Sequence, residues 1–451
     1  MHHLYFLLAI IIGLLVLSVL VFVHELGHFL AAKACKIRVL AFAIGFGRTL
    51  WSFKRGDTEY RVNAIPFGGY VQMAGENPAG ERSGADDEYS SKPIWQRAVV
   101  AIAGPVANMI FAVFTLWAAF VHGIDRPAFL DSTRVGVVLK DSPAAIAGFL
   151  AGDSIVSING APVSTWEQVD THLSQQLGSG YAIALIRAGN PLEFGLHVER
   201  TGAHLPKMLS GGLMPARYPP VIGGVKPKSG AEGLLEVGDT LLALKGVPVS
   251  SFDHFAMLMR EFDPDADGEP AASINIKRGP EPMHVFVIPT YDSTEKRYLL
   301  GIEPAPEPTR IVRYGVIEAL GPTMGKTWEY SAMIFDVLGK LTSGKVPASQ
   351  LAGPLNIIPV SGMMAFQGLS SILNFMALIG INLAVLNLLP LVITDGGLLM
   401  FLIIEAIRGR PLSAESQAAV NKVFIFLFLA LFLFVTFNDL QRLPQLFNWG
   451  K

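Results

Sequence analysis

The sequence is poor in cysteine and in charged residues. It contains one cysteine, Cys35, among 451 residues, which excludes an intramolecular disulfide and any metal site built from several cysteines. Charged residues make up only 16% of the chain, whereas soluble domains carry about a quarter. The formal net charge of -2 gives no reason to expect nucleic-acid binding. The hydrophobic content of 51% instead indicates a membrane protein rather than a disordered chain or an ordinary soluble domain.

Four apolar stretches are long enough to span a membrane, which takes about 20 residues. They cover residues 4–32, 98–121, 372–404, and 423–437 with its flanks. The first has no Lys or Arg before its apolar run and is long for a signal peptide, so we interpret it as a retained span. Lys and Arg gather in residues 33–97 and 405–422, which the positive-inside rule places in the cytoplasm. Residues 122–370 and both termini are therefore predicted to lie outside, which in a bacterium is the periplasm.

The predicted outer segment contains an internal repeat. Gly152-Asp153 and Gly238-Asp239 each open an alternating apolar strand that ends at a second glycine turn. A β-rich run precedes each copy, and a helix beginning with Ser or Thr follows it. This pattern resembles the PDZ domain, which typically binds an extended peptide at a sheet edge. The alternative is that both domains bind nothing and serve as spacers or lids.

The loop between the first two spans has the pattern of a small sheet. Apolar and polar side chains alternate over residues 58–65, and the segment Phe67-Gly68-Gly69-Tyr70 follows. An open sheet edge facing lipid is costly, so we expect this element to be buried in protein or its edge to be completed by a bound peptide. The alternative is a soluble cytoplasmic hairpin that only links the spans.

The first span carries the segment His24-Glu25-Leu26-Gly27-His28, an H-E-x-x-H motif. On a helix, His24 and His28 share one face and can hold one zinc ion, while Glu25 is placed to take a proton from the attacking water. Two histidines and a glutamate in an apolar span cost free energy unless they are paired or bind something. The alternative is that the three residues only hydrogen-bond inside a helix bundle.

A zinc enzyme needs a third protein ligand, and Asp395 is the only acid between residues 372 and 404. The first and third predicted spans run in the same direction and place all three ligands in their inner halves. The predicted site therefore lies below the cytoplasmic surface. Asn382 and Asn387 precede Asp395 and need hydrogen-bond partners at membrane depth. We predict that Asn387 contacts the substrate backbone, and that Asn382 does so or joins helices.

Taken together, these features resemble the site-2 protease family over essentially the whole chain. The further segments that carry this resemblance are Ala103-Gly104-Pro105-Val106-Ala107-Asn108, Leu351-Ala352-Gly353-Pro354, and the Asn-x-x-x-x-Asn-x-x-Pro pattern from Asn382 to Pro390. The resemblance implies an intramembrane zinc endopeptidase with one zinc ion on His24, His28 and Asp395. Implied substrates are single-span proteins, such as an anti-sigma factor already trimmed on its outer side, and remnant signal peptides.

The resemblance also implies how substrates reach the site. The PDZ pair would exclude proteins with bulky external domains, and peptide C-termini are possible PDZ ligands. The segment from Phe67 to Tyr70 would receive the unwound substrate as an added strand. One departure stands out: Val392, Thr394 and Leu398 replace the second Pro, the Leu and the His of the family pattern Pro-x-Pro-x-Leu-Asp-Gly-Gly-His. Because Val392 replaces a proline, the backbone bend that the proline would favour is not predicted by this sequence. Thr394 is a candidate hydrogen-bonding partner near Asp395.

The predicted architecture is a polytopic α-helical membrane protein of four transmembrane helices, with a membrane-associated β-hairpin and two external α/β PDZ-like domains. We expect it in the bacterial inner membrane, in contact with lipid, with the PDZ-like domains periplasmic and no nucleic-acid partner. The first span is predicted at 1–37, the β-rich loop at 38–95 and the second span at 96–122. Two PDZ domains cover 123–210 and 211–310, and an amphipathic linker covers 311–370. The third span, with Asp-Gly, is 371–407, and the fourth span with its tail is 408–451.

Two other functional classes stay open. Intramembrane ligands and a broken third span suit a zinc carrier, but Glu25 and the lack of repeated transmembrane halves argue against it. The other class is a catalytically inactive PDZ scaffold.

Overall fold

The computed structural model describes residues 2–76, 84–175, 180–197, 211–264, 270–292, 297–343, 353–391 and 394–447. The chain forms two compact units. One, which we call the helical unit, joins Met1–Ile124 with Val312–Lys451, and the other, the repeat unit, is Asp125–Ile311. The helical unit is therefore built from both ends of the chain.

The helical unit contains helices of membrane-spanning length. Its described helices are α1 (His2–Ala34), η1 (Tyr89–Ser91), α2 (Ile94–His122), α7 (Leu320–Thr342), α8 (Pro354–Gln367), α9 (Leu369–Leu388), α10 (Asp395–Arg408) and α11 (Ala414–Phe447). Within the described residues, four helical segments are long and apolar enough to cross a membrane: Leu7–Ala34, Ile94–His122, Leu369–Leu388 and Glu415–Leu440. Each overlaps one of the four apolar stretches that the sequence predicts.

The third predicted span is two helices rather than one. The sequence predicts a single interrupted span over 371–407, whereas α9 ends at Leu388 and α10 begins at Asp395. Leu389 has an extended backbone with ψ 145° because the next residue, Pro390, disfavours the helical conformation before it and cannot donate a helical hydrogen bond. This break puts Asp395 at the first turn of a new helix.

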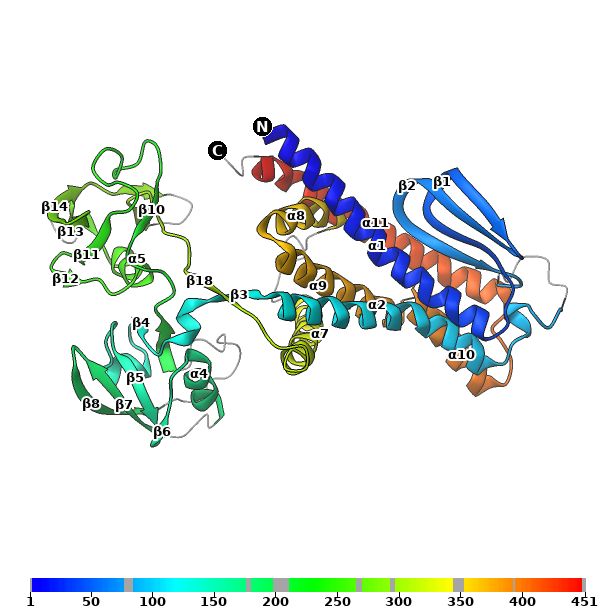
Figure 1. Cartoon of the computed structure of the whole chain (residues 1–451), viewed down its shortest axis with the longest axis horizontal. Helices are drawn as coiled ribbons and strands as arrows, with labels where there is room; N and C mark the ends of the chain where they lie inside the picture. The colour runs from blue at the N-terminus through cyan, green and yellow to red at the C-terminus, as the bar shows by residue number, and fades with distance from the viewer. Residues whose placement is uncertain are drawn as a thin grey trace. The chain divides into compact units, whose positions relative to one another are not determined.

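Helix α2 packs against α1, α9 and α10 (Figure 1). The crossing of α1 and α2 is close because it is lined by small residues. A Cβ atom on Gly27 of α1 would lie 2.3 Å from the Ala103 carbonyl oxygen and 2.7 Å from the Ala107 Cβ of α2. Residues larger than glycine at position 27 would push the two backbones apart, so the crossing depends on that glycine.

A curled sheet lies along α1 in the same unit (Figure 1). It is formed by β1 (Val39–Arg55) and β2 (Thr58–Met73), which extends the predicted hairpin. The segment Ala41–Ile44 pairs with Glu59–Val62 on one side and with Gly69–Gln72 on the other. Among the described strands, the segment Gly69–Met73 is paired on one side only, so it forms an edge of the sheet. We call Gly69–Met73 the edge strand.

The repeat unit contains two domains of the same topology. Their four-stranded sheets have the orders β6-β5-β7-β8 and β12-β11-β13-β14. The first domain contains β4 (Val135–Val138), α3 (Pro143–Ile146), β5 (Ser154–Ile158), β6 (Ala161–Pro162), α4 (Trp166–Gln175), β7 (Gly180–Arg187), β8 (Asn190–His197) and β9 (Leu213–Pro215). The second contains β10 (Ile222–Val225), β11 (Thr240–Leu244), β12 (Val247–Pro248), α5 (Phe252–Arg260), β13 (Ala272–Arg278), β14 (Glu281–Val287), β15 (Thr290–Asp292), β16 (Arg297–Leu299) and β17 (Ile302–Pro304). Outside both lie β3 (Ile124–Pro127), η2 (Ala128–Asp131) and β18 (Thr309–Val312).

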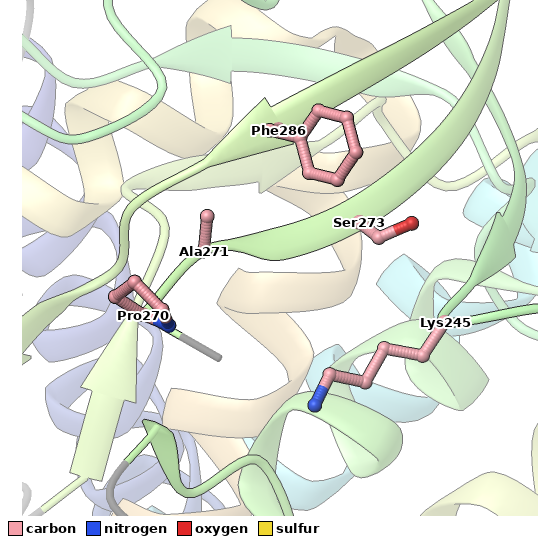
Figure 2. Close-up of a pocket in the computed structure, with 5 residues that line it drawn as sticks. All are labelled: Lys245, Pro270, Ala271, Ser273 and Phe286. Carbon is pink, nitrogen blue, oxygen red and sulfur yellow. The ribbon is translucent and has the colours of Figure 1, made fainter. Parts of the chain in front are cut away.

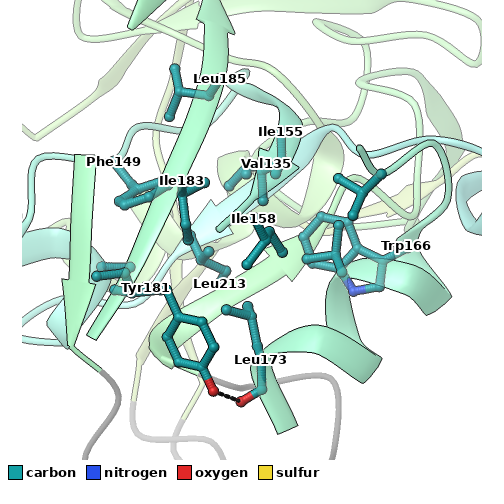
Figure 3. Close-up of a cluster of buried hydrophobic side chains, with 14 residues drawn as sticks. Val135, Phe149, Ile155, Ile158, Trp166, Leu173, Tyr181, Ile183, Leu185 and Leu213 are labelled. Atoms are coloured by element: carbon teal, nitrogen blue, oxygen red, sulfur yellow. Dashed lines mark hydrogen bonds between the residues drawn. The ribbon is translucent and has the colours of Figure 1, made fainter. Parts of the chain in front are cut away.

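The first repeat domain extends past the boundary expected at residue 210. Strand β9 pairs with β4, so Leu213–Pro215 completes the first domain rather than opening the second. Figure 3 shows the core of this domain, in which apolar side chains from β5, β7 and α4 meet. The Tyr181 hydroxyl in this core donates a hydrogen bond to the Leu173 carbonyl oxygen at 3.0 Å.

The aspartate of each Gly-Asp motif forms an ion pair with an arginine of the same domain. Asp153 is 1% exposed and accepts hydrogen bonds from Arg187 Nε at 2.7 Å and Nη2 at 2.8 Å. In the second domain, Asp239 accepts the same pair of bonds from Arg278 Nε and Nη2, each at 2.8 Å. Burial alone would raise the pKa of the Asp239 carboxyl, but its hydrogen bonds with Arg278 lower it below its usual value. The motif thus supplies one buried, bidentate ion pair per repeat.

Candidate active site

The three predicted metal ligands come together in the helical unit. His24 and His28 project from α1, and Asp395 is the first residue of α10. The Nε2 atom of His24 lies 3.3 Å from Asp395 Oδ2, and that of His28 lies 3.4 Å from Asp395 Oδ1. The two Nε2 atoms are 3.2 Å apart, and all three ligand atoms lie within 4.8 Å of one another.

The hydrogen bonds around the cluster fit a bound cation. His28 Nδ1 donates to the Val100 carbonyl oxygen at 2.7 Å, so in a neutral ring the Nε2 atom presents a lone pair toward Asp395. Asp395 Oδ2 is buried and has no hydrogen-bond partner among the residues that the structure describes. Electron-pair donors therefore converge, and a mostly buried cluster of this kind requires a positive charge among them. Two imidazole nitrogens and a carboxylate are a donor set that suits Zn²⁺.

One face of α2 closes the site opposite the histidines. Val100, Gly104 and Asn108 are four residues apart and therefore lie on this face. A Cβ atom on Gly104 would lie 2.2 Å from His28 Nε2 and 2.8 Å from His24 Cε1, so only glycine leaves room for both rings. Asn108 is fully buried, and its Nδ2 lies 3.4 Å from His24 Nδ1.

The break between α9 and α10 is held by local contacts. The Thr394 hydroxyl lies 2.9 Å from the Leu389 carbonyl oxygen and 2.8 Å from that of Leu391, so it can donate to either. A Cβ atom on Gly396 would lie 2.2 Å from the Leu389 carbonyl oxygen. The turn that places Asp395 therefore needs glycine at 396 and is closed by the hydroxyl of Thr394.

These contacts address the departures from the family pattern. The hydroxyl of Thr394 closes the turn, and Leu398 packs on an apolar cluster that includes Ile37 and Val39. Val392, which stands at the second proline of the pattern, lies outside the described residues. Thr394 and Leu398 thus both have packing or hydrogen-bonding roles in this chain.

Glu25 lies between the metal ligands and the edge strand. A Cβ atom on Gly69 would lie 3.0 Å from Glu25 Cγ. The edge strand therefore passes directly beside the predicted general base. A residue with a side chain at position 69 would displace Glu25.

The remaining predicted substrate-binding residues fall into two groups. Gly68, Gly69 and Tyr70 lie on β2, and the Tyr70 hydroxyl accepts a hydrogen bond from Arg61 at 3.3 Å. Phe67 is also on β2, but its side chain lies outside the described residues. Asn382 and Asn387 are half-buried on α9, and within the described residues no hydrogen bond joins either side chain to the three ligands.

Sequence reasoning missed two features of the site. Asn108 is an amide inside an apolar span, which is the signal that drew attention to Asn382 and Asn387, so the same argument could have found it. Arg97 and Glu405 form a bidentate ion pair, with Nη2–Oε1 at 2.5 Å and Nη1–Oε2 at 3.0 Å. This pair joins the start of α2 to α10, and no sequence pattern links two residues so far apart.

The repeat unit contains a separate pocket of about 470 Å³ (Figure 2). It is lined by Lys245, Pro270, Ala271, Ser273 and Phe286. The Lys245 ammonium lies over the ring of Phe262 at 4.6 Å, and the Ser273 hydroxyl is 3.0 Å from His284 Nε2. The described lining offers one cation and one hydroxyl but no cluster of metal ligands.

Comparison with known proteins identifies the family. The model of peptidase family M50 matches residues 12–431, which include all three ligands and Glu25. The chain belongs to peptidase family M50, the site-2 protease family. It is therefore a zinc metalloprotease, and the resemblance predicted from its motifs is confirmed.

Full-length relatives of this M50 peptidase are similar along nearly their whole length. The regulator of sigma-E protease RseP of Escherichia coli is 34% identical over 95% of this chain and 97% of its own. A putative zinc metalloprotease of Neisseria meningitidis is 34% identical over 97% of this chain and 99% of its own. Among solved structures, the PDZ domain of an SdrC-like protein from Listeria monocytogenes is 23% identical over 18% of this chain and 81% of its own, with a TM-score of 0.15.

Proposed function

We propose that this M50 peptidase cuts the membrane-spanning segments of single-span proteins. One zinc ion per chain would be held by His24, His28 and Asp395, with Glu25 as the general base. The observation that carries the proposal is that the three ligand atoms lie within 4.8 Å of one another beside Glu25 and an unpaired strand edge.

The zinc ion and Glu25 would have different roles in the reaction. A zinc ion bound there supplies Lewis-acid polarisation of the scissile carbonyl and activation of water. Glu25 accepts a proton from the attacking water and delivers it to the leaving amine, as its place next to the ligands in sequence and space permits. The side chains of His24, His28 and Asp395 are only 12–19% exposed, so their charges act in surroundings of lower dielectric constant than water.

The edge strand offers a way to present a helix for cutting. The backbone of an intact helix is satisfied by internal hydrogen bonds, so a substrate must unwind and replace those bonds before hydrolysis. Pairing with Gly69–Met73 would replace them by strand addition, next to Glu25. In this proposal Phe67, Gly68 and Tyr70 flank the added strand, and Asn387 and Asn382 contact the substrate backbone.

The biological setting follows from the relatives. The name "regulator of sigma-E protease" supports an anti-sigma factor, trimmed on its outer side, as the substrate type, with remnant signal peptides as a further class. We infer a multi-pass protein of the bacterial inner membrane with the repeat domains in the periplasm and the active site near the cytoplasmic side. The repeat domains would exclude bulky substrates and bind peptide C-termini, whose carboxylate suits a cation such as Lys245.

A cleavage assay tests the proposal. The full chain in detergent is mixed with a single-span substrate that lacks a large external domain, and zinc content is measured in parallel. We expect wild type to cut and a chelator to stop it. Glu25→Gln should bind zinc at one per chain but not cut. The control Glu281→Gln changes an exposed glutamate on β14 and should behave as wild type.

Three results would contradict the proposal. Near-normal turnover by Glu25→Gln would show that Glu25 is not the general base. Zinc binding without any cleavage by wild type would favour a scaffold, and zinc flux across liposomes would favour a carrier.

A further inference from the structure

Asn108 is a buried amide with only half of its hydrogen-bonding groups used. Its side chain is 0% exposed, and its Oδ1 atom is buried without a hydrogen-bond partner in the described part of the chain. Its other end, Nδ2, lies 3.4 Å from His24 Nδ1. An unsatisfied buried acceptor destabilises the fold, so its presence beside a proposed metal ligand calls for a reason.

The chemistry of a histidine ligand supplies that reason. A neutral imidazole that binds a metal through Nε2 carries its proton on Nδ1, and that N–H needs an acceptor. His28 has one, because its Nδ1 donates to the Val100 carbonyl oxygen at 2.7 Å. For His24, the only hydrogen-bond partner of Nδ1 among the described residues is the Asn108 side chain.

The Asn108 amide can meet this need by turning. Its nitrogen is only a donor, but its oxygen is an acceptor, and the two ends have nearly the same shape. The terminal torsion of asparagine is broad and roughly two-fold, so a half-turn exchanges the two ends. That half-turn faces Oδ1 toward His24 Nδ1–H and gives the orphan acceptor a partner. Both ligand histidines would then donate from Nδ1 to an oxygen on the same face of α2.

We propose that Asn108 is a positioning residue that accepts the His24 Nδ1–H through its Oδ1 atom. This bond holds His24 in the tautomer whose Nε2 lone pair points to the metal. The inference rests on the proposed function, because it takes His24 to be a zinc ligand. With this bond, both histidines donate a hydrogen bond from Nδ1: His28 to the Val100 carbonyl oxygen and His24 to Asn108 Oδ1.

Two substitutions separate the acceptor from the rest of the side chain. Asn108→Asp keeps an oxygen at the same place, loses the donor and, when ionised, adds a negative charge beside His24. Asn108→Leu keeps the volume and loses both groups. If Asn108 served only to pack α2 or to donate a hydrogen bond, aspartate would be no better than leucine. Asn438 on α11 is a matched control, since it too is buried and its Nδ2 has no partner.

The test measures zinc dissociation constants of the full chain in detergent by competition with a fluorescent chelator. We expect Asn108→Leu to bind zinc about 10- to 100-fold more weakly, as outer-contact losses do, and Asn108→Asp to stay within about threefold of wild type. Asn438→Leu should not change the constant. Melting temperatures in excess chelator establish that each variant is folded, and Asn108→Ala replaces the leucine variant if that one does not fold.

The outcomes are distinct. Equal zinc affinity in wild type and the leucine or alanine variant overturns the inference, as does an aspartate variant as weak as leucine. His24→Ala is measured beside them and should lose tight binding. If His24→Ala binds zinc as wild type does, the ligand assignment of the proposed function is wrong, independently of Asn108.

Discussion

Gly104→Ala is the sharpest single test of the site geometry. A Cβ atom at this position would lie 2.2 Å from His28 Nε2 and 2.7 Å from its Cε1, whereas ordinary van der Waals contact begins at 3.4 Å. The His28 ring must therefore move by roughly 1 Å, or α2 must shift away from α1. A displacement of about 1 Å at a reacting centre can cost 10²-fold in rate, which corresponds to about 2.7 kcal/mol of transition-state stabilisation.

The same substitution should not unfold the protein. Alanine is a better helix former than glycine by about 1 kcal/mol, so α2 itself gains stability. Gly325→Ala on α7 is the matched control, because nothing lies within 4 Å of the added Cβ atom. We expect Gly325→Ala to leave kcat/KM unchanged and Gly104→Ala to lower it by about 10²-fold or more, with weaker zinc binding.

The assay is cleavage of the single-span substrate with zinc titrated to saturation. Melting temperature in chelator is the folding control. A Gly104→Ala variant with kcat/KM within threefold of wild type and normal zinc affinity would refute the close contact between α2 and the two imidazoles.

The other predictions concern the two kinds of ion pair. Arg97→Ala and Glu405→Ala should each lower activity and melting temperature, because breaking a buried pair costs about 3–5 kcal/mol and releases α10 from α2. The exchanged pair Arg97→Glu with Glu405→Arg should recover part of the loss, and a double variant worse than either single change would show that the pairing is not what matters. In the repeat unit, the lowered pKa of Asp239 means that its ion pair with Arg278 stabilises the fold above about pH 4 and that this stabilisation is lost as pH falls. Calorimetry of the full chain between about pH 3 and 7 should show a second-domain transition that falls on acidification, and Asp239→Asn should lower it at neutral pH and flatten its pH dependence. An unchanged slope in that variant would assign the acid sensitivity to another group.

The candidate ligands stand out in the sequence because charged and polar groups are rare inside apolar spans. His24, Glu25 and His28 share a motif whose chemistry requires their spacing, and Asp395 is the only acid in its stretch. The repeat could be found because each copy keeps the Gly-Asp pair, whose carboxylate the structure buries against an arginine.

Other features depend on how the helices are rotated and where they cross, which sequence patterns do not encode. The contact of Gly104 with both imidazoles exists only because Gly27 lets α1 and α2 approach closely. The pairing of Ala41–Ile44 on both sides follows from bends at Gly45 and Gly47, each with φ above 80°. A period-two pattern predicts a strand but not how often that strand folds back on its neighbours.

The order of the ligands along the chain has a consequence during synthesis. His24, Glu25, His28 and the edge strand are all made within the first 124 residues, whereas Asp395 belongs to the last part of the helical unit. The whole repeat unit, Asp125–Ile311, is translated between them. With the proposed assignment, a nascent chain holds the proposed base and two of the proposed ligands long before the third is made. The peptidase should be inactive until the ribosome has nearly finished it, so that neighbouring membrane proteins meet the enzyme only after its repeat domains are complete.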